Sequence, residues 1–127
     1  MCVKNREPVF SNKHIGTAAV DVIMRQRRQG RYYLHAYCVM PDHIHLLLKL
    51  REHGGSLPVV VAVIKAGIRH AAMPHGVVTW MRGFHERVKR EYERADEYVK
   101  YILLNPVRAG LVREAADYPY VGSVDPY

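Results

Sequence analysis

Two histidines separated by a single residue provide the first sign of chemistry in this chain. His43 and His45 flank Ile44 within residues 43–50, where side chains alternate with the period of a β-strand. Both imidazoles then leave one face of the strand, about 7 Å apart along it, and such a pair can share one divalent cation. The competing interpretation is two polar residues on the wet face of a half-buried strand, but the turn Pro41-Asp42 exposes them at the strand's start.

A tyrosine and an asparagine form the second candidate. Tyr101 and Asn105 are four residues apart at the end of a helix predicted over about 91–104, so they share a face. A tyrosine hydroxyl becomes a competent nucleophile when a metal ion or a donor polarises the phosphate that it attacks, and Asn105 can supply an oxygen ligand one turn away. The competing interpretation is that tyrosines in amphipathic helices lie at the edge of the core, which holds for most of the nine in this chain.

The charge balance points to an anionic partner. The chain has 19 Lys and Arg against 12 Asp and Glu, a net charge of +7, and nucleic acid is the usual partner of such a surface because phosphate neutralisation releases counterions. A merely soluble basic surface is the alternative. Aromatic and basic residues alternate in 80–87, which suits base stacking as well as it suits a core tryptophan beside a turn. The candidate DNA-binding residues are Arg25, Arg27, Arg28, Lys65, Arg69, Trp80, Arg82 and Arg87.

Length and composition exclude several classes of protein. A chain of 127 residues, 49% hydrophobic and 24% charged, predicts one globular domain over residues 1–127 rather than a disordered segment. Its longest apolar run, 57–64, is far short of the roughly 20 residues of a membrane span, and no secretory signal is visible. Two cysteines do not make a disulfide framework, so a cytoplasmic location is expected.

The elements that must position these residues follow an α+β order. A partial strand within residues 1–6 precedes a hairpin of strands and three helices, in the order strand, helix, strand, strand, helix, strand, helix. This order predicts a ferredoxin-like split βαβ arrangement, an antiparallel sheet with helices on one face. The predicted helices cover 12–29, 57–73 and 91–104, and the predicted strands cover 32–40, 43–50 and 77–80.

Two runs of the sequence resemble a known family. The run 36–48, AYCVMPDHIHLLL, resembles the metal-binding strand of the single-tyrosine HUH transposases of insertion sequences, and the run 101–112, YILLNPVRAGLV, resembles their tyrosine helix. The NPVRAGL form is typical of the branch called REP-associated tyrosine transposases, and 80–87 and 117–123 also resemble that branch. The similarity extends from about Asn5 to Ser123, and only the end of the family's first strand is expected here.

The resemblance implies a reaction. His43 and His45 would hold Mg²⁺ or Mn²⁺ on the scissile phosphate of single-stranded DNA, with Asn105 as the third ligand. Tyr101 would attack phosphorus, form a 5′-phosphotyrosine link and free a 3′-hydroxyl. The 3′-hydroxyl of a second strand could then reverse this step and join the ends, and no ATP would be required. The partners implied are hairpin-forming repeat ends. The residues alone favour Mn²⁺ or Zn²⁺, because imidazole suits softer metals, so Mg²⁺ rests on the resemblance.

Two other functions remain open at this point. A decayed or domesticated relative would bind single-stranded nucleic acid without cutting it. An unrelated metal hydrolase would use His43 and His45 with an acid such as Asp42, and its turnover would not need Tyr101. Whether the protein is a monomer or a homodimer with the tyrosine helix acting in trans is likewise open.

Overall fold

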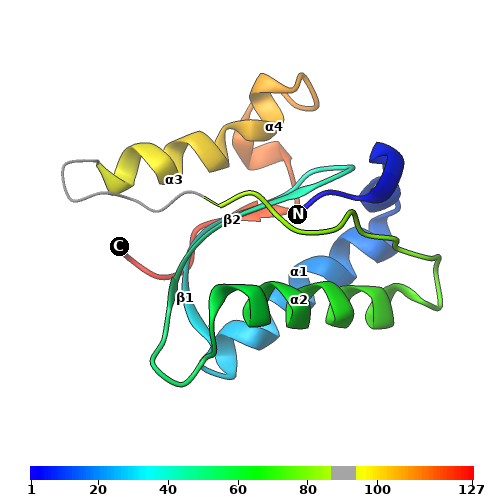
Figure 1. Cartoon of the computed structure of the whole chain (residues 1–127). Helices are drawn as coiled ribbons and strands as arrows, with labels where there is room; N and C mark the ends of the chain where they lie inside the picture. Colours follow the sequence, from blue (N-terminus) through cyan, green and yellow to red (C-terminus); the bar gives the residue numbers. More distant parts are fainter. Residues whose placement is uncertain (87–93) are drawn as a thin grey trace.

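The structure of the chain is a computed structural model that describes residues 1–86 and 94–127 (Figure 1). No helix in these two ranges is long and apolar enough to cross a membrane. Three short 3-10 turns, at Lys4–Arg6, Val9–Ser11 and Ala115–Asp117, join the longer elements. The helices are α1 (Lys13–Arg28), α2 (Leu57–Ala72), α3 (Ala95–Leu103) and α4 (Asn105–Arg108), and the strands are β1 (Tyr32–Val39), β2 (Ile44–Leu50) and β3 (Val121–Gly122).

The sheet is antiparallel and has the order β2-β1-β3. Two isolated antiparallel β-bridges continue the sheet beyond the β2 edge. Cys2 pairs with His43, and Val3 pairs with Trp80. The lateral order from Trp80 through Val3, β2 and β1 is the one that a split βαβ arrangement requires. The predicted α+β class and antiparallel sheet are therefore confirmed. The predicted partial strand in 1–6 and short strand in 77–80 are present as these bridges.

The helices α1 and α2 cover one face of the sheet, as predicted (Figure 1). Asn12 caps α1 by accepting hydrogen bonds from the backbone of His14 and Ile15 at 2.9 and 3.4 Å. The valine-rich α2 is helical because it buries a continuous apolar stripe against α1 and the sheet, which outweighs the β propensity of its valines. That stripe consists of Val60, Val61, Ile64, Ile68 and Ala72.

The helix α3 packs on the opposite face, which differs from the prediction that the helices share one face (Figure 1). A β-bulge between Leu34 and Ala36 changes which side chains of β1 face α3. Before the bulge Leu34 faces α1 and α2, and after it Ala36 and Cys38 face the other way. These two small buried side chains leave room for Ile102 of α3, so β1 contributes to a core on each side of the sheet.

The C-terminal segment is tied to the helix layer through Asp125. Its carboxylate accepts hydrogen bonds from Nε and Nη2 of Arg27, at 2.8 and 2.6 Å, and from the backbone N–H of Leu34 at 2.7 Å. The hydrogen bond from Arg27 is the main reason that the pKa of Asp125 is lowered to about 2. We expect Asp125→Asn to lower the melting temperature by about 5 °C at pH 7, because charge-assisted bonds are lost.

The same substitution has a defined pH dependence. The folded protein holds the pKa of Asp125 below its unfolded value of 3.8, so the stabilisation is complete above about pH 4 and is lost as the pH falls toward 2. Melting curves of wild type and Asp125→Asn should therefore converge as the pH falls from 4 to 2. A constant difference across that range would contradict the assignment.

Candidate active site

The two histidines converge at the start of the hairpin's second strand. The Nε2 atoms of His43 and His45 are 3.0 Å apart, and their rings meet at 81° with centroids 4.8 Å apart. Ile44 between them is buried in the core under α1 and α2, so both imidazoles lie on the other face of the sheet. The prediction that the pair shares one face is confirmed. The two Nε2 atoms are closer to each other than the spacing of about 7 Å between alternate residues of a strand.

An acidic residue lies behind the pair. Oδ1 of Asp42 is 2.6 Å from Nδ1 of His43, and Oδ2 accepts a hydrogen bond from Nε of Arg6 at 2.7 Å. Burial on its own would raise the pKa of Asp42, but the hydrogen bonds from His43 and Arg6 outweigh burial and lower it below its usual value. The carboxylate is therefore ionised at neutral pH and accepts a hydrogen bond from Nδ1–H of His43. The other nitrogen of that ring, Nε2, faces His45.

His45 is held neutral by its surroundings. Burial lowers the pKa of His45 to about 4, and electrostatic interactions with His43, the N-terminus, Arg108 and Arg6 lower it further. A neutral imidazole keeps a lone pair, which is the form that binds metal ions. The surroundings of His45 thus favour the neutral form that can bind a metal ion.

The residues present fit a divalent metal ion. Two nitrogens at about 2.1 Å from one ion and at right angles to each other would lie roughly 3 Å apart, as the two Nε2 atoms do. The carboxylate of Asp42 on the far nitrogen of His43 is the outer partner that commonly orients a metal-binding histidine. Within residues 1–86 and 94–127 no group of three or more His, Cys, Asp or Glu could hold a metal ion, so a third ligand from these residues would be of another type.

The tyrosine and the asparagine lie on two helices instead of one. The helix α3 ends at Leu103 and α4 begins at Asn105, because Pro106 has no N–H to continue the helical hydrogen bonds. The prediction that one helix carries both residues is therefore wrong. Of the predicted helix over 91–104, the structure shows α3 from Ala95 to Leu103, and residues 91–93 lie outside the described residues. Tyr101 is 57% exposed, whereas its neighbour Ile102 is buried against Cys38. The phenol is thus open to a ligand above the sheet face that carries the histidines.

Arg108 joins the two residues across the break. Its Nη2 donates to the carbonyl of Tyr101 at 2.5 Å and to Oδ1 of Asn105 at 3.4 Å, and its guanidinium carbon is 3.8 Å from the centre of the Tyr101 ring. Nδ2 of Asn105 is buried and has no hydrogen-bond partner among the described residues. The sequence interpretation did not assign Arg108 a role, although its spacing of three and seven residues from Asn105 and Tyr101 is helical.

Three of the predicted DNA-binding residues have structural roles. Nζ of Lys65 donates to the carbonyls of Met81 and Gly83 at 3.0 and 2.7 Å. The half-buried Trp80 donates from Nε1 to the carbonyl of Lys65 at 3.1 Å and packs on Phe10 with ring centroids 5.8 Å apart. Arg27 is paired with Asp125. These interactions hold the loop after α2 and the C-terminal segment against the core.

The remaining basic candidates are exposed. The residues Arg25, Arg28, Arg69 and Arg82 are exposed at the surface, and Arg87 lies outside the described residues. Arg25 and Arg28 belong to α1 and Arg69 to α2, so these three lie on the layer behind the sheet from His43 and His45 (Figure 1). The structure does not bring these three basic residues together with the histidines on one face.

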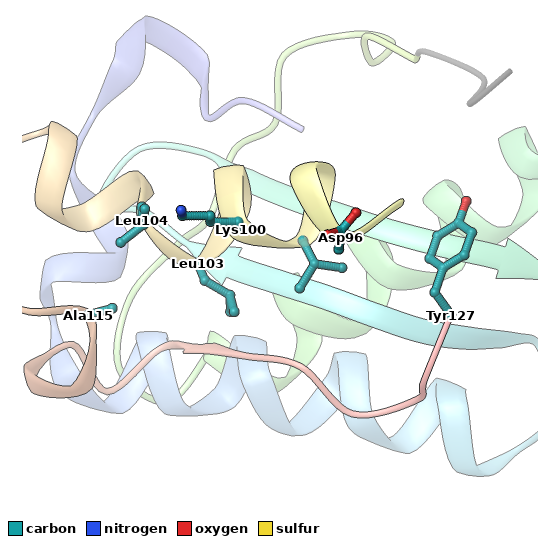
Figure 2. A pocket seen from close by; sticks show the side chains of 7 residues that line it. Asp96, Lys100, Leu103, Leu104, Ala115 and Tyr127 are labelled. Atoms are coloured by element: carbon teal, nitrogen blue, oxygen red, sulfur yellow. The ribbon is translucent and has the colours of Figure 1, made fainter. Parts of the chain in front are cut away.

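A cavity of about 250 Å³ includes the histidine pair. Its lining also includes Cys2, Leu57, Phe84 and Glu86. A second hollow of about 490 Å³ lies between α3 and the C-terminal segment, where Figure 2 shows Asp96 and Lys100 along the helix and Tyr127 at one end. Its lining does not include Tyr101 or the histidines. The candidate active site is centred on the hollow around the histidines. Tyr101 does not line that hollow, but it belongs to α3, which packs on the same face of the sheet.

Cys38 can report on the packing of β1 next to the site. It is buried and pairs with His45 across the hairpin, and burial raises the pKa of its thiol to about 12. We expect iodoacetamide at pH 7.5 to alkylate the half-buried Cys2 in the folded protein and to spare Cys38 until urea unfolds the chain, since the thiolate is the reactive form. Peptide mass mapping identifies the labelled cysteine. Equal labelling of both thiols without urea would show that Cys38 becomes accessible to solvent in the folded protein.

Comparisons with known proteins place this chain in a family. A profile described as IS200-like transposase matches residues 1–71, a range that contains His43 and His45 but not Tyr101. A putative REP-associated tyrosine transposase of Haemophilus influenzae is 30% identical over 99 residues, 67% of this chain and 55% of that protein. The REP-associated tyrosine transposase of Escherichia coli K12 is 28% identical over 98 residues, 77% of this chain and 58% of that protein.

The fold has a counterpart among solved structures. The structure of a REP-associated tyrosine transposase bound to a REP hairpin superposes with a TM-score of 0.73 at 24% identity, over 94% of this chain and 71% of that one. The similarity in fold thus extends past the profile match into α3, α4 and the C-terminal segment. The chain spans a little over half the length of the two curated relatives. It belongs to the IS200-like transposase family.

Proposed function

We propose that this chain is the catalytic domain of a transposase that cleaves and rejoins single-stranded DNA through a 5′-phosphotyrosine intermediate. The observation that carries the proposal is the convergence of the Nε2 atoms of His43 and His45, 3.0 Å apart, on the sheet face over which α3 holds an exposed Tyr101. The names of the two curated relatives support its coarser part, a tyrosine transposase.

The proposed reaction is a balanced transesterification. The hydroxyl oxygen of Tyr101 attacks phosphorus, the bond from phosphorus to the 3′-oxygen breaks, and the phenolic proton is transferred to that leaving oxygen. The products are a 5′-phosphotyrosine link on one DNA piece and a free 3′-hydroxyl on the other. Attack by a 3′-hydroxyl reverses the step. One phosphodiester replaces another, so no ATP is required.

A divalent cation is the proposed cofactor, either Mg²⁺ or Mn²⁺. His43 and His45 would hold it, and Oδ1 of Asn105 is the candidate third ligand from the protein. When bound, the ion would polarise the scissile phosphate and neutralise charge that builds on its oxygens. Asp42 fixes the orientation of His43 and is itself held by Arg6, so it serves as the outer carboxylate of the site.

The proposed substrate is single-stranded DNA that forms a hairpin. The solved relative is bound to a REP hairpin, and this chain has a net charge of +7 with exposed arginines on its helices. Such a protein would work in the cytoplasm. Action of α3 on the histidine pair of a second copy, in a homodimer, is the alternative arrangement.

The test uses a single-stranded oligonucleotide with a hairpin, labelled at either end. With Mn²⁺ or Mg²⁺, the 3′-labelled strand should become covalently attached to the protein, and the 5′-labelled strand should shorten and carry a free 3′-hydroxyl. Peptide mass mapping should find the added nucleotide mass on Tyr101. Salt-sensitive binding with no adduct in either metal would instead identify a relative that binds without cutting.

A further inference from the structure

We propose that Arg108 is a positioning residue that holds the Tyr101 ring in its reactive orientation. The inference rests on the proposed function, since it concerns the nucleophile of that reaction. Arg108 is the residue whose guanidinium lies over the Tyr101 ring, 3.8 Å from its centre. The same group donates to the carbonyl of Tyr101 and toward Oδ1 of Asn105.

The need for such a residue follows from exposure. Tyr101 is 57% exposed, so few neighbours restrain its side chain, whereas its hydroxyl must reach phosphorus within about 3–3.5 Å and in line with the leaving oxygen. A planar guanidinium can lie flat on an aromatic ring and donate hydrogen bonds from its edge at the same time. The Arg108 guanidinium lies over the Tyr101 ring and donates to the carbonyl of the same residue, so it can hold the ring relative to the backbone of Tyr101.

The break between the helices explains why the contact comes from this position. Asn105 begins a new helix at the break, so the angle between α3 and α4 decides where Tyr101 and Asn105 lie relative to each other. Arg108 spans that break with one side chain and contacts a residue on each side of it.

A structural role alone makes a different prediction. The hydrogen bond from Arg108 to the Tyr101 carbonyl also satisfies one of the free acceptors at the end of α3. A lysine can reach a carbonyl and keeps the charge, but it has no plane to lie on the ring. Arg108→Lys thus separates capping and charge, which it retains, from stacking, which it loses.

The experiment measures folding, binding and chemistry separately in Arg108→Lys. The matched control is Arg51→Lys, because Arg51 lies over the ring of the exposed Tyr33 at 4.8 Å at the far end of the hairpin. We expect Arg108→Lys to keep its melting temperature and its affinity for hairpin DNA within about twofold, and to form the adduct about 10- to 100-fold more slowly at saturating DNA. Arg51→Lys should react at the wild-type rate.

Two results would overturn the inference. Adduct formation by Arg108→Lys at the wild-type rate would show that stacking does not matter, and a slower rate matched by weaker binding or a lower melting temperature would assign Arg108 to DNA contact or to capping. A measurement that does not need activity is the nuclear magnetic resonance shift of the Arg108 Nε proton. The ring should displace that resonance in wild type and Tyr101→Phe but not in Tyr101→Leu.

That measurement also separates the two proposals. If wild type forms no adduct in Mn²⁺ or Mg²⁺, the proposed reaction fails whatever Arg108 does. The ring-dependent shift then decides whether Arg108 holds Tyr101, and its absence in wild type would refute the positioning role independently.

Discussion

Replacing Tyr101 with phenylalanine is expected to abolish the covalent protein–DNA complex. The substitution removes one oxygen, the atom that would attack phosphorus, and it leaves the ring for Arg108 to cover. Loss of a nucleophile lowers turnover far more than loss of a contact does, so we expect a decrease of about 1,000-fold or more in adduct formation. Gel analysis of the 3′-labelled hairpin strand bound to denatured protein measures it.

The control for Tyr101→Phe is Tyr33→Phe, which also removes an exposed hydroxyl beneath an arginine. Binding of uncleaved hairpin should be unchanged in both variants, since each substitution removes a single oxygen and keeps the ring. An adduct that persists in Tyr101→Phe would move the nucleophile elsewhere, and Tyr98, one turn earlier in α3, would be tested next. Multiple-turnover hydrolysis that survives the substitution would favour the metal hydrolase instead.

Removal of the paired imidazoles has the second largest expected effect. We expect His43→Gln with His45→Gln to eliminate tight Mn²⁺ binding in calorimetry and to lower adduct formation by about 100-fold or more, because the two converging Nε2 atoms are lost together. Asp42→Asn should weaken Mn²⁺ binding by about 10- to 100-fold, since it removes the carboxylate that orients His43. Melting temperatures show whether each variant is folded.

The chain contains a natural control for this prediction. His14 and His75 also form a pair, but their rings are stacked within 15° of parallel with centroids 4.6 Å apart. Lone pairs lie in the ring planes, so stacked rings do not direct them at one ion. The double variant His14→Gln with His75→Gln should therefore bind Mn²⁺ and form the adduct as wild type does. Wild-type metal binding by the His43 and His45 double variant would refute the proposed ligands.

Much of the local structure was predictable from the sequence because it depends on neighbouring residues. The alternation after Pro41-Asp42 places His43 and His45 on one face whatever the rest of the chain does, and the hairpin follows from the same turn. The cap at Asn12 and the apolar spacing that follows it predict α1 in the same way. The extents of these elements agree with the structure to within a residue or two.

Local patterns were less informative about ionic and aromatic side chains. Arg27, Lys65 and Trp80 have the composition of a DNA-binding surface, yet Arg27 is paired with Asp125, 98 residues away, and Lys65 holds two backbone carbonyls. Nothing in the neighbourhood of a lysine indicates whether a distant segment will bring an acceptor to it. The structure therefore decided which charges remain on the surface.

The sequence by itself determined the residue types of the site and the face from which the histidines project, because strand periodicity is a local property. Only the tertiary structure decided that α3 covers the face with the histidines and that Arg108 lies on Tyr101. Two small backbone irregularities lie at these contacts, the bulge between Leu34 and Ala36 and the helix break before Pro106. A bulge exchanges the two faces of a strand and a break redirects a helix, so each changes which distant residues meet.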